Sequence, residues 1–276
     1  MNLYIWHPDT QALIMLSQIL RTLLAVSAVA AAPVAEADCD LATLQGAVAN
    51  YLTAQTSGSS SALTGLASST TYTQNDKTAD VKAGILSSAL QITHNRSSYD
   101  TTQCATYTEL IVASSAKPYV IGTQMRFTGS SITKMQSLVT TTGDWLFNAT
   151  GTLYWASKES WGTIPEAQRD TRATIQAAAD AYLNLFLNKT VVVPWGTPCD
   201  RLEGGSYTGN GSPTDSCNVG VPSGLDLTNR RYVIDESVGA VDVFLNFGGA
   251  TGLPDSHEFR VQSGKLRYVH TLTVMT

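Results

Sequence analysis

Charge is scarce in this chain of 276 residues. Only 14% of the residues are charged, the formal net charge is −5, and the 17 Lys and Arg residues form no cluster. Proteins that bind nucleic acid or an anionic membrane surface need a basic patch. We therefore expect neither nucleic acid nor a membrane as a partner, and a neutral or small ligand instead.

Several catalytic signatures are also missing. The sequence has no G-x-S-x-G, no P-loop, no G-x-G-x-x-G and no H-E-x-x-H pattern. The four cysteines leave none free if two disulfides form, and His257 and His270 fall on separate predicted strands. We expect no metal site and no cofactor.

Long apolar runs are absent after the amino-terminal 38 residues. Within 1–38, Arg21 precedes an apolar run at 23–32, and small residues follow it before Cys39. This pattern predicts a secretory leader over 1–38, too short in its apolar part to span a bilayer, with Met15 as an alternative start.

Two further features favour export. The cysteines all follow the leader, and their even number suits two disulfides: Cys39, Cys104, Cys199 and Cys217. Four N-glycosylation sequons begin at Asn95, Asn148, Asn188 and Asn210. The sequence therefore predicts a secreted protein or one in the lumen of the secretory pathway.

Hydrophobic periodicity predicts helices and strands in alternating blocks. We expect helices over 40–53 and 165–188, with loops over 56–73 and 194–226. The expected strands cover 89–94, 103–113, 119–127, 134–142, 230–247, 257–261 and 265–274. Residues 144–161 are rich in aromatic side chains and are expected to form a packed connection.

The two halves resemble each other. AVANYLT at 47–53 matches AADAYLN at 178–184, and TKMQSLVTTT at 133–142 matches GKLRYVHTLT at 264–273, at a spacing of roughly 131–135 residues. This repeat predicts two tandem α+β domains, 39–161 and 162–276. It favours pairing Cys39 with Cys104 and Cys199 with Cys217, one of three connectivities.

The last strand carries a histidine on an apolar face. Alternation places the apolar side chains on one side and mostly polar ones on the other, the apolar set being Leu266, Tyr268, His270, Leu272 and Val274. We expect the helix at 165–188 to cover that side, so that His270 points into a hollow. The repeat sets His257 opposite Thr123 and His270 opposite Val139, which favours an active cavity in the second half.

A family resemblance supports this architecture. RLEGGSYTG at 201–209, NRRYVIDESVGAVDVF at 229–244 and PDSHEFRV at 254–261 resemble a fungal secreted family of the SnoaL-like, or nuclear transport factor 2-like, superfamily. The resemblance implies two tandem cones, each a helix with a curved antiparallel sheet. It also points to the hetero-Diels–Alderases of tropolone–sesquiterpene biosynthesis.

Both histidines are candidates for acid–base catalysis. His270 can exchange a proton in a partly dry pocket, or it can be a core histidine bonded to a neighbouring strand. His257 can pair with Asp255 or Glu258, which would fix its tautomer, or it can be a surface residue beside an Asx turn.

Other candidates lie in polar clusters and along the helix. Either Arg231 or Tyr232 can face the cavity and polarise an oxygen, or both belong to an ion-paired strand start. Glu203 is either an acid in a lid over the cavity or a structural partner of Arg201. The expected apolar wall consists of Tyr268, Tyr182, Phe186, Trp195 and Leu272, some of which can be plain core residues.

These features favour an enzyme that needs no cofactor, an isomerase, dehydratase or cyclase acting on an apolar small molecule. The resemblance extends this to a cycloaddition between a tropolone quinone methide and a terpene alkene, aided by orientation and hydrogen bonding. The alternatives are a secreted binding or effector protein that uses the cavity only for affinity, and a structural cell-surface protein. A homodimer is left open.

Overall fold

The computed structural model describes residues 39–113 and 116–275. The predicted leader and Met15 lie outside the described residues. The helices are α1 (Leu41–Ser57), α2 (Ala149–Ala156) and α3 (Arg172–Leu185), with short 3₁₀ turns η1 (Ser60–Ala62), η2 (Ile85–Ser87) and η3 (Glu166–Gln168).

Twelve strands among the described residues form two six-stranded sheets. The first sheet has the order β2-β1-β6-β5-β4-β3. Its strands are β1 (Leu66–Gln74), β2 (Lys77–Thr78), β3 (His94–Asp100), β4 (Ala105–Val112), β5 (Tyr119–Thr128) and β6 (Ser131–Thr140). The second sheet has the order β8-β7-β12-β11-β10-β9. Its strands are β7 (Trp195–Glu203), β8 (Ser206–Tyr207), β9 (Leu227–Asp235), β10 (Ala240–Phe247), β11 (Leu253–Gln262) and β12 (Lys265–Thr273).

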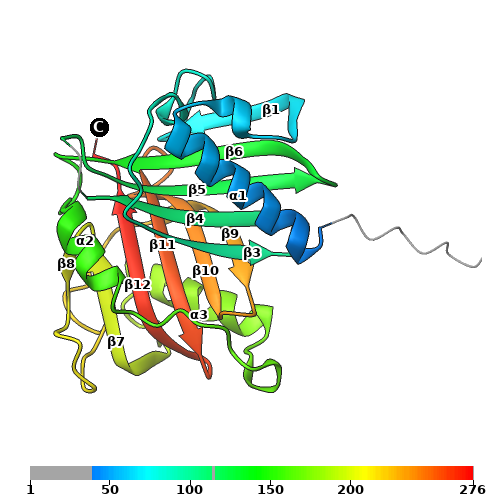
Figure 1. Cartoon of the computed structure of the whole chain (residues 1–276). Helices are drawn as coiled ribbons and strands as arrows, with labels where there is room; N and C mark the ends of the chain where they lie inside the picture. The colour runs from blue at the N-terminus through cyan, green and yellow to red at the C-terminus, as the bar shows by residue number, and fades with distance from the viewer. Residues whose placement is uncertain (1–38, 114–115, 276) are drawn as a thin grey trace, which may run out of the picture. The chain divides into compact units, whose positions relative to one another are not determined.

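The two sheets repeat one topology. In each, four strands form an antiparallel meander whose last strand pairs in parallel with an earlier strand, β6 with β1 and β12 with β7. A helix precedes each sheet and packs on it, α1 on the first and α3 on the second (Figure 1). The predicted α+β class with two tandem sheet-plus-helix units is confirmed. The predicted domain boundary falls in the segment between α2 and η3.

Several predicted elements differ from the structure. Strands β1, β7 and β8 occupy stretches expected to be loops, and 89–93 is loop where a strand was expected. The long helix starts at Arg172, because residues 166–168 form η3 and Thr171 then caps α3 by accepting from Thr174 N. Both disulfides, Cys39–Cys104 and Cys199–Cys217, have the predicted pairing and fit an oxidising environment.

Each sheet buries two faces. One face packs on the helix of the same unit, and the other packs on the other sheet, so the described residues form one compact unit. Between the sheets, Tyr107 meets Phe244 edge to face at 6.2 Å. Nearby, Gln124 Nε2 donates to Asp242 Oδ2 at 2.6 Å. Burial on both faces explains why the strands are apolar or neutral along most of their length.

None of the helices in 39–113 and 116–275 has the length and apolar character needed to cross a bilayer. The asparagines of all four predicted sequons are exposed. Asn148 also caps α2, since its Oδ1 accepts from Gly151 N at 3.0 Å.

Candidate functional site

The second sheet-plus-helix unit contains an apolar cavity of about 250 Å³. It lies between α3 and the sheet face that α3 covers. Its apolar walls include Tyr182, Phe186, Leu225, Phe247 and Leu253. Such a largely apolar hollow with a few polar groups is typical of a small-molecule site.

His257 supplies a titratable group to this cavity. Its ring is only 2% exposed, and its Nδ1 lies 2.5 Å from Asp255 Oδ1. Asp255 is itself buried, and its second oxygen accepts from the Thr273 hydroxyl at 2.6 Å. A carboxylate at Nδ1 fixes the tautomer that carries hydrogen there, which leaves Nε2 as the basic nitrogen. Among the described residues, the hydrogen bond of the His257 ring is the one at Nδ1, so Nε2 is left for a ligand.

The sequence-based choice between Asp255 and Glu258 as the partner of His257 is thereby decided in favour of Asp255. Positions two apart on a strand point to the same face, whereas Glu258 points to the opposite one. Glu258 accordingly lies between the two sheets, against Arg96.

A guanidinium and a phenol line the same cavity. Arg201 is buried, and its Nε forms an ion pair with Glu203 Oε1 at 3.0 Å. Burial raises the pKa of Tyr182, and the nearby charge of Arg201 opposes that rise without cancelling it. Tyr182 therefore stays a neutral hydrogen-bond donor, and its ring lies 5.8 Å from that of His257.

The rim of the cavity comes from segments far apart in the sequence. Trp145, in the connection after the first sheet, and Met275, at the end of the described chain, both line it and are 47% and 43% exposed. Pro222 and Leu225 contribute from the stretch after the Cys199–Cys217 disulfide. Trp145 was not among the predicted site residues, because nothing in the sequence shows that its connection reaches the second unit.

The first unit fills the corresponding space with hydroxyl groups. Thr123 pairs with Ser137 across β5 and β6, just as His257 pairs with Thr271 across β11 and β12. Thr123 Oγ1 bonds both to Tyr51 OH at 2.8 Å and to Ser137 Oγ at 2.9 Å. These three buried groups satisfy one another, so the site chemistry belongs to the second unit.

His270 does not lie in this cavity, contrary to the sequence-based expectation. The prediction assumed unbroken alternation along the last strand, but the register shifts between Leu266 and Tyr268. Because of this bulge, Leu266 packs with the α3 core, whereas His270 turns toward the first sheet. The repeat register was also wrong here, since the partner pairs place His270 opposite Gln136.

The face of the last strand that was predicted to be polar and solvent-exposed is the one that α3 covers. Val269 belongs to the α3 core, and Thr271 and Thr273 line the cavity with about 6% exposure each. The exposed Lys265 and the partly exposed Arg267 gave that face its polar appearance, but both lie near the hairpin end of the strand.

His270 joins a buried charge network between the sheets. Its Nδ1 lies 2.9 Å from Glu109 Oε2, and its Nε2 lies 2.6 Å from Glu159 Oε2. Arg96 Nη2 contacts His270 Nδ1, Glu109 and Glu258, and its guanidinium stacks on Trp161 at 3.8 Å. The histidine is thus held by both sheets and by the connection between α2 and η3.

The charges of this network shift its pKa values strongly. Burial alone would lower the pKa of His270, but the carboxylates of Glu159 and Glu109 outweigh it and raise the pKa to about 10. For Glu109, burial is likewise outweighed by His270 and Arg96, which lower its pKa to about 2. Burial raises the pKa of Glu258, so Glu258 is more easily protonated than Glu109.

Glu109, Glu258 and His270 also offer ligand atoms within 4.8 Å of one another, the spacing of a metal site. Arg96 occupies their centre and brings the positive charge that a metal ion would bring. The network therefore ties the two sheets together with a guanidinium.

The remaining predicted residues divide between several places. Glu203, Tyr182 and Phe186 line the cavity. Trp195 packs behind Tyr182 at 5.7 Å, and Leu272 lies in the core between the sheets.

Arg231 and Tyr232 point to opposite sides of β9, as predicted, but neither lines the cavity. Arg231 pairs with Asp76 of the first unit at 2.9 Å. Tyr232 OH donates to Asp180 of α3 at 2.7 Å. Tyr268 borders a separate groove, described below.

A domain of unknown function (DUF8021) matches residues 168–273. The match runs from the end of η3 through α3 and the whole second sheet, and it contains His257, Asp255, Arg201 and Tyr182. It leaves out Trp145 and Met275 at the rim. No curated protein matches the chain.

Proposed function

We propose that the second unit is a cofactor-independent acid–base enzyme that isomerises or dehydrates one small, mostly apolar substrate in its cavity. The observation that carries the proposal is the buried Asp255–His257 pair opening into an apolar hollow. A carboxylate that fixes one ring nitrogen leaves the other free to take or give a proton.

The other polar groups of the cavity have complementary roles. His257 Nε2 removes a proton from a carbon next to a carbonyl group of the substrate. The imidazolium then gives this proton back, either to another carbon, which completes an isomerisation, or to a β-hydroxyl group, which leaves as water. Tyr182 donates a hydrogen bond to the oxygen on which negative charge develops, and the Arg201 guanidinium stabilises that charge. Glu203 holds Arg201 in place through their ion pair. The sequence resemblance to SnoaL-like proteins supports the same division between a cone-shaped pocket and a few polar groups.

The size of the cavity favours one substrate over two. At about 250 Å³ it lies below the range of roughly 300–1,000 Å³ usual for drug-sized ligands. A tropolone quinone methide and a terpene together would need a larger site, so the proposal is limited to a unimolecular reaction on a compact ring compound.

Exchange of carbon-bound hydrogen tests the chemistry before the natural substrate is known. The full chain is incubated in D₂O with small cyclic ketones and enones, and deuterium uptake next to the carbonyl is followed by NMR. We expect uptake with the native chain and its loss in His257→Gln. The control is His94→Gln, at the start of β3 and outside the cavity.

The same assay identifies the rival function. Ketones that bind to both the native chain and His257→Gln with equal affinity, without deuterium uptake in either, would contradict catalysis. That result would assign the cavity to binding alone, as in a secreted carrier or effector.

We further propose that the chain enters a eukaryotic secretory pathway and carries glycans at its exposed sequons. The even set of disulfides and the sequence of the first 38 residues support this. Expression in a eukaryotic secretory host, followed by enzymatic removal of N-glycans, should lower the apparent mass. An unchanged mass would contradict glycosylation.

A further inference from the structure

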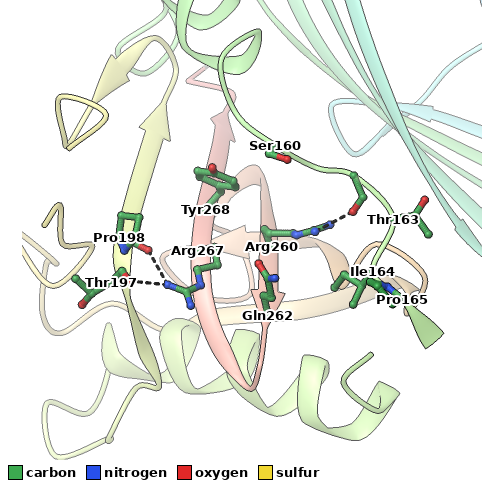
Figure 2. A pocket seen from close by; sticks show the side chains of 11 residues that line it. Ser160, Thr163, Ile164, Pro165, Thr197, Pro198, Arg260, Gln262, Arg267 and Tyr268 are labelled. Atoms are coloured by element: carbon green, nitrogen blue, oxygen red, sulfur yellow. Dashed lines mark hydrogen bonds between the residues drawn. The ribbon is translucent and has the colours of Figure 1, made fainter. Parts of the chain in front are cut away.

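A second hollow, of about 470 Å³, lies outside the cavity and shares no lining residue with it. It is an open groove between β7, the β11–β12 hairpin and the segment at 160–165. Figure 2 shows Arg267 extending toward β7 and Arg260 toward that segment, with Tyr268 above the two arginines and Gln262 below them. We call it the arginine groove.

The two arginines of the groove have no carboxylate partner among the described residues. Arg267 Nη1 donates to the carbonyl oxygens of Thr197 at 2.8 Å and Pro198 at 3.3 Å. Arg260 donates to the carbonyls of Gly162 and Val238. Arg126 and Arg169 also bond only to neutral oxygens, but neither lines a groove with a second arginine. The other described arginines have a carboxylate partner: Arg96, Arg172, Arg201, Arg230 and Arg231.

The groove is therefore a positively charged site on a chain whose net charge is negative. No Asp or Glu lines it, although the formal net charge of the chain is −5. Arg260 is only 5% exposed, and its Nε is buried without a hydrogen-bond partner. A buried guanidinium that is solvated only by carbonyl groups gains free energy when an anion approaches it.

The rest of the lining suits a sugar ring better than a bare anion. Ser160, Thr163 and Thr197 bring hydroxyl groups, and Gln262 brings an amide that can both donate and accept. The half-buried ring of Tyr268 offers a flat apolar surface, against which the C–H face of a sugar can pack.

The groove also continues beyond one sugar unit. A neighbouring hollow of about 460 Å³ shares Pro198 and Tyr268 with it. That hollow is bordered by Trp155 and Tyr207, which stack on each other with ring centroids 4.1 Å apart, and also by Lys158, Glu159 and Asp200. Because two carboxylates line it, this second hollow can extend the site for a neutral sugar unit, whereas the acidic unit belongs at the arginines.

From this arrangement we propose that the arginine groove binds an acidic oligosaccharide, with uronate carboxylates placed near Arg260 or near Arg267 and a sugar ring on Tyr268. The site is independent of the proposed acid–base reaction, because the two hollows share no lining residue.

The test is a titration of the full chain with trigalacturonate, maltotriose and sodium sulfate, followed by calorimetry at low salt. We expect trigalacturonate to bind at least about tenfold more tightly than maltotriose, and to bind more weakly as salt increases. Equal affinity for the two trisaccharides, or no binding of trigalacturonate, would overturn the proposal. Sulfate binding as tight as trigalacturonate would overturn the assignment to a saccharide.

Gln262→Glu is the decisive variant, because Gln262 is exposed and lines the groove. The added negative charge should weaken trigalacturonate about tenfold through repulsion of the carboxylate. Gln168→Glu makes the same change in η3, outside the groove, and should stay within about twofold of the native chain. Equal effects of the two variants would contradict binding in the groove.

Arg267→Gln gives a second comparison, with Lys265→Gln on the same strand as its control. Arg267 also holds the β7 carbonyls, so thermal unfolding is measured alongside. A folded Arg267→Gln variant that binds trigalacturonate as the native chain does would likewise overturn the proposal.

Discussion

Asp255 holds the ring of His257 by its Nδ1, with 2.5 Å between the two atoms. The second oxygen of the same carboxylate accepts from the Thr273 hydroxyl, so Asp255 is fixed from both sides. Asp255 and His257 lie two residues apart on β11, so their side chains project from the same face of that strand. The orientation of the pair is therefore set by β11 and β12 before any ligand arrives.

Asp255→Asn should abolish most of the proposed activity while the cavity keeps its shape. An amide cannot stabilise the imidazolium and favours the wrong tautomer, an effect worth about 10⁴ in rate where an Asp–His pair has been studied in a protease. Deuterium uptake in the ketone assay measures the loss. Thr273→Val removes only the outer hydrogen bond and serves as the milder control. Native uptake rates in Asp255→Asn would remove the pair from the mechanism.

Thr271→Met should block ligand binding without unfolding the chain. The Thr271 hydroxyl is buried and has no partner among the described residues, so its removal should change the free energy of unfolding little. The longer methionine side chain would enter the cavity. Thr271→Val keeps the volume and should bind ketones as the native chain does. Ligand-observed NMR gives both affinities, and equal binding by the methionine and valine variants would contradict the placement of the ligand.

Arg96→Met should destabilise the fold by about 3–5 kcal/mol, because it leaves Glu258 and Glu109 buried without their guanidinium. Adding Glu258→Gln should restore part of that loss. Denaturant unfolding measures the free energies. Arg169→Met is the control, since this exposed arginine bonds only to the carbonyl of Ile164 and should change stability by about 0.5 kcal/mol or less. Equal effects of the two arginine variants would contradict the role of the network.

Stability should fall at alkaline pH through His270. The folded pKa of about 10 lies above the ordinary value of 6.5, so the folded state binds the proton more tightly. The resulting stabilisation is complete below about pH 6.5 and is lost as the pH rises toward 10. The groups that face the ring are Arg96, Glu109, Glu159 and, across the strand pair, Glu258.

Unfolding measured from pH 6 to 10 in the native chain and in His270→Gln isolates this contribution. The native chain should lose more stability over that interval than the variant does. Parallel curves for the two proteins would show that His270 carries no extra proton in the folded state.

Loss of the Cys199–Cys217 disulfide should loosen the rim of the cavity. The cross-link closes a short loop, and a loop of about 15 residues is worth about 3 kcal/mol in the chain-entropy account. It also positions the Cys217 carbonyl, which accepts from Arg201 Nη1 at 3.4 Å. Replacing both cysteines by serine should lower the melting temperature and weaken ketone binding. Unchanged binding would show that the rim is held without the cross-link.

The sequence predicted the repeat because equivalent positions keep the same chemical character. Tyr51 and Tyr182 both sit on the buried stripe of the helix that precedes a sheet. The hairpins match as well, since Phe127 pairs with Ile132 as Val261 pairs with Leu266. From this symmetry the pairing of both disulfides followed correctly.

Which side chains of the last strand share a face could not be predicted, because the residue types around the β-bulge do not indicate its presence. A shift between Leu266 and Tyr268 exchanges the faces of the residues that follow it, and with them the surroundings of His270. Burial on both faces of the strand made the prediction harder, because such a strand has no solvent-exposed face whose polar residues would show the orientation of the others. Strands β1 and β7 were missed because Ser, Thr, Gly and Pro dominate their neighbourhoods.

Because the two sheets pack against each other, the matched segment cannot keep its buried contacts when it is separated from the rest of the chain. Cut out at 168–273, it would lose the partners of Glu258, His270 and Asp242 and would expose Phe244 to water. The matched segment contains only one of the two sheets, whereas the core between the sheets is built from side chains of both. Expression of that piece should yield aggregated protein, because the face that the first sheet covers would be exposed to water.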